Sequence, residues 1–158
     1  MKPPRFDYSA PTTIDEAVAL ISEKGPDAKI LAGGQSLVPL LNFRLARPES
    51  LIDINGVDEL DYVSANGSMV IGGLTRLTTL EESNSTNGLM AKALPHIGHR
   101  AIRNRGTIGG SLAHNDPAAE LPAVLMVLNA EVTATSSTGE RTMTVSELVG
   151  ERFFETTL

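Results

Sequence analysis

Residues 29–41, KILAGGQSLVPLL, place a short apolar run directly before two glycines, and the polar pair Gln35 and Ser36 follows them. Glycine accepts positive φ and lets another group approach the backbone closely. Where such glycines follow a strand, successive backbone N–H groups often form a concave binding site for an anion. A plain tight turn is the alternative for an isolated Gly-Gly pair, so the interpretation depends on the rest of the chain.

The Gly-Gly pair recurs at 72–73 and 109–110, and the three pairs account for six of the 14 glycines. Each pair ends a short apolar run, in the stretches ILAGG, VIGG and TIGG. If these turns lie side by side, their N–H groups and the hydroxyls of Ser36, Thr107 and Ser111 would surround a pyrophosphate. The chain contains neither a P-loop nor a GxGxxG fingerprint, so the familiar nucleotide-binding loops are excluded.

The composition is that of a folded, acidic chain without cysteine. Apolar residues make up 41 % of the 158 residues, enough for one sizeable core. Thirteen basic residues face 19 acidic ones, a net charge of −6, which argues against nucleic-acid binding. The chain has no thiolate to hold an iron–sulfur cluster. No apolar stretch has the length of a signal peptide or membrane span, so we expect a cytoplasmic protein without membrane insertion.

The local patterns predict an α+β fold rather than a doubly wound sheet. Thr13 and Glu16 have capping-box spacing ahead of a helix, and Gly25 with Pro26 marks its end. Asn66-Gly67 is a strong hairpin signal. The other expected elements are a buried strand at 28–32, a short helix capped by Ser36, a strand at 51–54, helices within 78–83, 88–99 and 117–129, the last one buried, and a hairpin around Thr138-Gly139.

Two long stretches together resemble a known family. The segment 102–122, IRNRGTIGGSLAHNDPAAELP, follows ILAGGQSL at the separation found in the FAD-binding (medium) subunit of the molybdenum hydroxylases. That family includes carbon monoxide dehydrogenases and xanthine dehydrogenases. The resemblance extends over essentially the whole chain, from PPRFDYSAPTTIDEAVALI at its beginning through the LIDI strand. Either glycine motif alone is weak, but both in this order are specific.

The resemblance implies which residues hold the cofactor. Ala32, Gly33, Gly34, Gln35 and Ser36 correspond to the family's first FAD pyrophosphate loop, with Leu31 and Leu37 at its edges; Thr107, Ile108, Gly109, Gly110 and Ser111 correspond to the second. Glu120 matches a position where family members usually carry Asp, which binds the sugar-like chain of the flavin. No residue is expected to be catalytic, because electron transfer through a flavin needs the ring held in place rather than a protein acid or base.

The resemblance also implies an architecture. The family fold is a two-lobed α+β FAD-binding domain, of the kind also found in vanillyl-alcohol oxidases, with a smaller lobe at about 1–55 and a larger one at about 56–158. A separate C-terminal domain follows in the family. Since this sequence ends with ERFFETTL, about where that domain would begin, we expect the N-terminal FAD domain only.

By resemblance, the chain passes electrons from iron–sulfur clusters through FAD to an external acceptor. The expected partners are a molybdenum-binding large subunit, which oxidises the substrate, and an iron–sulfur small subunit that carries 2Fe-2S clusters. The lack of cysteine agrees with clusters held by a partner. Two alternatives remain open: a stand-alone FAD-dependent oxidoreductase of the same fold, and a non-catalytic assembly domain.

Other side chains offer less favoured interpretations. His96, His99, His114 and Asp116 include metal-ligating residue types, but two of them fall inside the flavin motif, and we expect no metal site. The loop arginines Arg103 and Arg105 are candidates for contact with a phosphate or a partner, against the simpler interpretation that both are solvated.

Overall fold

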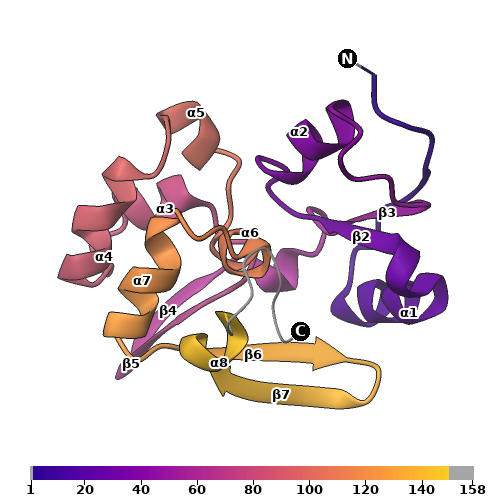
Figure 1. The fold of residues 1–158 in the computed structure, drawn as a ribbon. Helices are drawn as coiled ribbons and strands as arrows, with labels where there is room; N and C mark the ends of the chain where they lie inside the picture. The colour runs from indigo at the N-terminus through magenta and orange to yellow at the C-terminus, as the bar shows by residue number, and fades with distance from the viewer. Residues whose placement is uncertain (1, 150–158) are drawn as a thin grey trace.

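The computed structural model describes residues 2–149 and confirms the α+β class. Figure 1 shows the path of the chain. The helices are α1 (Ile14–Lys24), α2 (Leu37–Asn42), α3 (Leu77–Glu82), α4 (Gly88–Ala93), α5 (Arg100–Arg103), α6 (Ile108–His114), α7 (Glu120–Val127) and α8 (Val145–Val149). The strands are β1 (Asp7–Ser9), β2 (Ala28–Leu31), β3 (Ser50–Asp53), β4 (Val63–Asn66), β5 (Ser68–Ile71), β6 (Glu131–Ser136) and β7 (Gly139–Thr144). The stretch ERFFETTL, on which the expected domain end falls, lies outside the described residues.

The first strands form a parallel sheet in the order β1-β3-β2, seen on one side of Figure 1 with α1 and α2. Strand β3 lies in the middle and buries Ser50, Leu51 and Ile52. Strand β2 is an edge strand, and its Ile30 is 47 % exposed. The expectation of a buried strand at 28–32 was therefore wrong, because a short apolar run does not show whether a strand has neighbours on both sides.

Helix α1 begins and ends where the sequence predicts. Thr13 is its N-cap, and its hydroxyl accepts a hydrogen bond from the Glu16 N–H at 3.2 Å. The Glu16 carboxylate in turn accepts from the Thr12 N–H at 2.9 Å, one residue before the cap. Gly25 ends the helix with φ of 66°. The spacing of Thr13 and Glu16 in the sequence thus predicted the two residues whose side chains accept hydrogen bonds at the start of helix α1.

The remaining strands form two separate antiparallel hairpins, β4-β5 and β6-β7. In the first, Asn66 pairs with Ser68, so that Gly67 alone is the turn, with φ of 85°. In the second, Ser136 pairs with Gly139. Both hairpins lie where they were predicted, although each turn is displaced by about a residue from the expected dipeptide.

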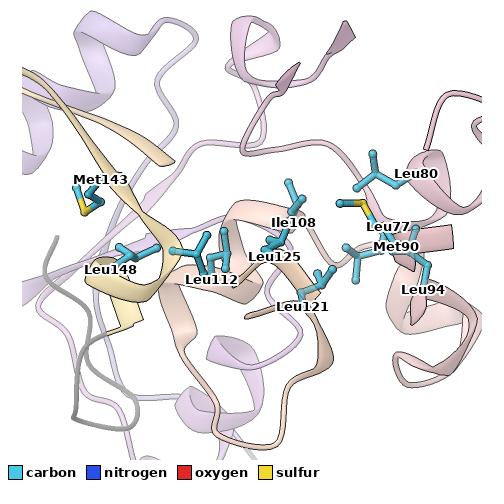
Figure 2. Close-up of a cluster of buried hydrophobic side chains, with 11 residues drawn as sticks. Leu77, Leu80, Met90, Leu94, Ile108, Leu112, Leu121, Leu125, Met143 and Leu148 are labelled. Carbon is cyan, nitrogen blue, oxygen red and sulfur yellow. The ribbon is translucent and has the colours of Figure 1, made fainter. Parts of the chain in front are cut away.

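A single apolar cluster joins helices α3, α4, α6, α7 and α8 to strand β7 (Figure 2). Its fully buried members include Leu80, Leu94, Leu121 and Leu148. Helix α7 contributes only one face, because Val127 is 71 % exposed. The helix that was expected to be buried is therefore buried on one face only. Within residues 2–149, no helix has the length and apolar character needed to cross a bilayer.

Candidate functional site

The first glycine pair forms a turn between strand β2 and helix α2. Gly33 is buried against the second glycine-rich segment, so closely that a Cβ atom there would lie 2.4 Å from the Arg105 carbonyl oxygen. Gly34 has φ of 74°, a conformation that L side chains rarely adopt. Since the obstacle at Gly33 is backbone, only glycine permits this approach.

The backbone of this turn presents unpaired donors. Within residues 2–149, no hydrogen bond uses the N–H groups of Gly34, Gln35, Ser36 or Leu37. Ser36 occupies the N-cap position before helix α2, but contrary to expectation its hydroxyl makes no capping hydrogen bond. The Gln35 side-chain amide donates to the Gly33 carbonyl at 3.2 Å. Four successive free N–H groups are the arrangement that binds an anion at a turn before a helix.

The second glycine segment is not a loop, contrary to expectation. Thr107 pairs with Arg76 in an isolated bridge and is the N-cap of α6, so that Gly109 and Gly110 lie in the first helical turn. The Thr107 hydroxyl accepts from the Gly110 N–H at 3.1 Å. A threonine with β-region backbone favours a helix start, and this preference overrides the two glycines.

The backbone N–H groups of residues 108–111 in this second segment already have partners. The Ile108 N–H donates to the Thr75 carbonyl at 3.1 Å, and the Gly109 N–H donates to the Gly73 carbonyl at 2.9 Å. The Ser111 N–H donates to the Thr107 carbonyl at 3.0 Å. The run of successive free amides therefore comes from the first turn, whereas residues 108–111 of the second segment form its supporting wall.

The expectation that the glycine pairs lie together is met. A Cβ atom on Gly109 would lie 2.6 Å from the Gly73 carbonyl oxygen, and one on Gly110 would lie 3.7 Å from the Ala32 side chain. Gly72 packs instead against the Leu60 carbonyl. Members of all three pairs thus meet in one place, although the first and third pairs are more than 70 residues apart in sequence.

A hollow of about 300 Å³ opens beside the first turn. Apolar side chains, the turn backbone and one cationic side chain line it: Leu31, Gly33, Gly34, Gln35, Val38, Pro39, Asn42 and Arg105. Arg105 is exposed, it lines the hollow together with Gly34 and Gln35, and its charge acts on Asp53 and Arg76. The sequence raised Arg105 as a candidate for phosphate contact, and the structure places it at the site.

A chain of polar side chains, not predicted from the sequence, connects the two glycine segments. The Tyr8 hydroxyl donates to Asp53 at 2.6 Å, and Asp53 accepts from the Asn55 side-chain amide, also at 2.6 Å. Arg76 donates to Asn55 Oδ1 at 2.6 Å and to the Arg105 carbonyl. These residues carry no motif, and only their distance in space reveals the connection.

The charges along this chain are linked. Burial raises the pKa of Asp53, but hydrogen bonds from Tyr8 and Asn55 and the charge of Arg105 outweigh burial, and the net pKa lies below its ordinary value. Burial and the like charge of Arg105 lower the pKa of Arg76, opposed by the carboxylates of Asp61 and Asp53. Two arginines and one ionised aspartate therefore surround the junction of the glycine segments.

The other candidate residues are distributed as follows. Glu120 is the first residue of α7, is half-buried, and has no hydrogen-bond partner within residues 2–149. Arg103 is 7 % exposed, and both Glu81 carboxylate oxygens accept from its guanidinium, at 2.8 and 3.1 Å. Arg103 is thus a structural residue, unlike Arg105. Within residues 2–149, the histidines, aspartates and glutamates form no group of three able to hold a metal ion.

Comparison with known proteins identifies the family of the chain. The family described as the FAD binding domain in molybdopterin dehydrogenase matches residues 4–157. The 6-hydroxypseudooxynicotine dehydrogenase complex subunit alpha of Paenarthrobacter nicotinovorans is 49 % identical over 162 residues, which cover 100 % of this chain and 55 % of that protein. The carbon monoxide dehydrogenase medium chain of Hydrogenophaga pseudoflava is 44 % identical over 147 residues, covering 90 % of this chain and 51 % of that protein.

A solved structure agrees with this assignment. It is the carbon monoxide dehydrogenase of Hydrogenophaga pseudoflava lacking the Mo-pyranopterin moiety of the molybdenum cofactor, with a TM-score of 0.96 and 41 % identity. The match covers all of this chain and 56 % of that one. The chain therefore spans about half the length of the curated relatives it matches. By sequence and by fold, it belongs to the family of FAD-binding domains of molybdopterin dehydrogenases.

Proposed function

We propose that the protein binds FAD at the glycine junction and is the flavin-carrying part of a molybdenum hydroxylase. The observation that carries the proposal is the set of four free backbone N–H groups at residues 34–37, beside a hollow that Gly34, Gln35 and Arg105 line. FAD contains a pyrophosphate, and successive amides with a neighbouring cation suit such an anion. The family assignment supports FAD rather than another phosphate-bearing ligand.

The residues present fit the cofactor. Because Gly33 has no side chain, its backbone packs directly against the Arg105 carbonyl, and no side chain of residue 33 stands in the turn. In this proposal, the turn at residues 32–36, with Leu31 and Leu37 at its edges, holds the pyrophosphate through the free N–H groups of residues 34–37. The segment Thr107–Ser111 supports the turn and contributes hydroxyl groups, while the N–H groups of residues 108–111 donate within the protein. Glu120 contributes a carboxylate that accepts hydrogen bonds from cofactor hydroxyls.

A bound flavin supplies one- and two-electron redox chemistry that side chains lack. The protein's own part is to hold the cofactor and shield it from water. The relatives are named as subunits or chains of dehydrogenases, including carbon monoxide dehydrogenase. We propose the corresponding assembly here: a molybdenum-binding subunit and a 2Fe-2S subunit deliver electrons to the flavin domain. We also propose that residues 1–55 and the residues from 56 onward form two lobes around the cofactor.

Flavin binding by the purified protein tests this function. We expect flavin absorption bands in the protein as isolated or after addition of FAD, and tighter binding of FAD than of riboflavin, which has no phosphate. ADP, which carries a pyrophosphate without a flavin ring, should compete with FAD. A folded protein that binds neither FAD nor ADP would contradict the proposal. Tight FAD binding with substrate turnover by the protein alone would favour the stand-alone oxidoreductase instead.

A further inference from the structure

Two carbonyl groups, one from each glycine segment, are connected by a pair of side chains. The Ala32 carbonyl, immediately before the first glycine pair, accepts from Asn55 Nδ2 at 2.8 Å. The Arg105 carbonyl, which touches Gly33, accepts from Arg76 Nη1. Arg76 Nη2 donates to Asn55 Oδ1 at 2.6 Å, which closes the connection. One Asn-Arg pair thus fixes the distance between the two backbone segments.

Asn55 is itself held in a single orientation. Its backbone N–H donates to Asp53 Oδ1 at 3.0 Å, and its side-chain amide donates to the same oxygen at 2.6 Å. The second Asp53 oxygen accepts from Tyr8 at 2.6 Å. Because the amide of Asn55 donates and its oxygen accepts, no other neutral side chain of this length satisfies both neighbours.

Arg76 directs its donors toward the protein and not toward the hollow. Two of its three nitrogens donate to Asn55 and to the Arg105 carbonyl, and Arg76 does not line the hollow, whereas Arg105 does. The planar guanidinium suits two acceptors in fixed directions, which a lysine ammonium cannot reproduce in the same geometry. The role of Arg76 is therefore distinct from supplying charge to a bound anion.

We infer that Asn55 and Arg76 are positioning residues that hold the turn at residues 32–36 against residues 105–107, and so aim its free amides at the cofactor pyrophosphate. This inference rests on the proposed function, because it names what the arrangement is for. Pre-organised donors bind an anion more tightly than donors that must be ordered on binding. Losing the Asn-Arg connection should therefore weaken FAD without removing any group that touches it.

The test uses three arginine variants of the full chain. Arg76→Gln removes the connection and the charge, and Arg76→Lys keeps the charge but not the two-acceptor geometry. Arg100→Gln is the control, because Arg100 pairs with Glu82 at an exposed site. We expect both Arg76 variants to bind FAD and ADP about tenfold more weakly, typical of one lost charged hydrogen bond. Arg100→Gln should match the wild type. Asn55→Ala should weaken binding similarly, and the double variant with Arg76→Gln no further.

Amide hydrogen exchange without flavin provides an independent measurement. Exchange at Val38 and Leu40, whose N–H groups donate to the Gly34 and Ser36 carbonyls of the turn at 3.0 and 3.2 Å, should be faster in Arg76→Gln than in the wild type, with unchanged exchange in helix α1. Wild-type FAD affinity in Arg76→Lys would overturn the inference in favour of a charge effect. Wild-type affinity and exchange in Arg76→Gln would overturn it outright. A wild-type protein that binds no FAD overturns the proposed function and the cofactor role, while faster exchange in Arg76→Gln would still show that the connection holds the turn.

Discussion

Gly33 is the residue at which the two glycine segments touch. Alanine at this position would place its Cβ 2.4 Å from the Arg105 carbonyl oxygen and 2.8 Å from the Gly106 Cα. Both neighbours are backbone atoms, so the segments must separate and the amides lose their shared direction. We therefore expect Gly33→Ala to lower FAD affinity by at least about tenfold, measured by fluorescence titration.

Gly88→Ala is a matched control for this substitution. Gly88 lies at the start of α4, and no atom lies within 4 Å of a Cβ built there. We expect its FAD affinity to equal that of the wild type. Equal affinity of Gly33→Ala and Gly88→Ala, in folded proteins, would contradict the role of the close contact.

A second prediction concerns the carboxylate of Glu120 and its effect on FAD affinity. Its carboxylate is half-buried and has no partner within residues 2–149, so it is available to accept a hydrogen bond. Glu120→Ala should weaken FAD binding by about 1–3 kcal/mol, the range for a lost charge-assisted bond. Glu120→Asp keeps the carboxylate and should retain most of the affinity. Equal affinities of all three proteins would remove Glu120 from the site.

Helix α5 carries two arginines that differ in how much they contribute to stability. Arg103 is buried and donates to the carbonyls of Ile97 and Gly98, at 3.1 Å each, in addition to Glu81. Arg100 pairs with Glu82 at the surface, where both side chains are at least 60 % exposed. Hydrogen bonds from a charged donor contribute about 1.5–3 kcal/mol each, whereas an exposed ion pair contributes about 0–1 kcal/mol.

We therefore expect Arg103→Ala to lower the free energy of unfolding much more than Arg100→Ala does. Urea unfolding followed by circular dichroism measures both variants under the same conditions. Equal losses would show that the carbonyl contacts of Arg103 contribute little. The FAD affinity of folded Arg103→Ala should change less than that of Arg76→Gln. The Arg103 side chain donates to Glu81, Ile97 and Gly98, and not to either glycine segment.

Among the helices and strands, the sequence predicted the features that depend on residues close to one another in the chain. The Thr13 cap, the Gly25 end of α1 and the two hairpins follow from local spacing. Thr107 through Gly110 was misread as a turn, because the N-cap preference of a threonine in an extended conformation was not weighed against the glycines. Strand β2 was misread as buried, because sheet order is invisible in one short strand.

The residues of the candidate site also divide into those that the sequence predicted and those that it did not. Its glycines were identified from their repetition and from resemblance to a family, and the structure brings them together. Asn55 and Arg76 were missed, because they are 21 residues apart and belong to no motif. Pairing of distant polar side chains is a property of the folded chain. The site residues themselves stay a prediction until cofactor binding is measured.

For the whole molecule, Asp53 makes stability depend on pH. Its pKa lies below its ordinary value of 3.8 in the folded state, so folding is favoured by its ionisation. That contribution is fully present above the unfolded value and is lost as the pH falls through the folded pKa. Tyr8→Phe removes one cause of the lowered pKa while leaving the carboxyl in place.

We expect Tyr8→Phe to be less stable than the wild type at pH 7, because it lacks one hydrogen bond to a partly exposed carboxylate. The difference should narrow as the pH is lowered from 5 toward 3. Urea unfolding of both proteins across this range is the measurement. A difference that stays constant with pH would show that the hydroxyl does not favour the ionised form of Asp53.

The contact of Gly33 with Arg105 also has a consequence for the order of events during synthesis. The two residues are 72 positions apart. At about 5–20 residues per second, the ribosome needs roughly 4–14 s to add the second after the first. Through that interval the nascent chain contains the first glycine turn but lacks the segment that packs against it. The pocket is therefore a late product of translation, and cofactor loading must wait for the middle of the chain rather than its beginning.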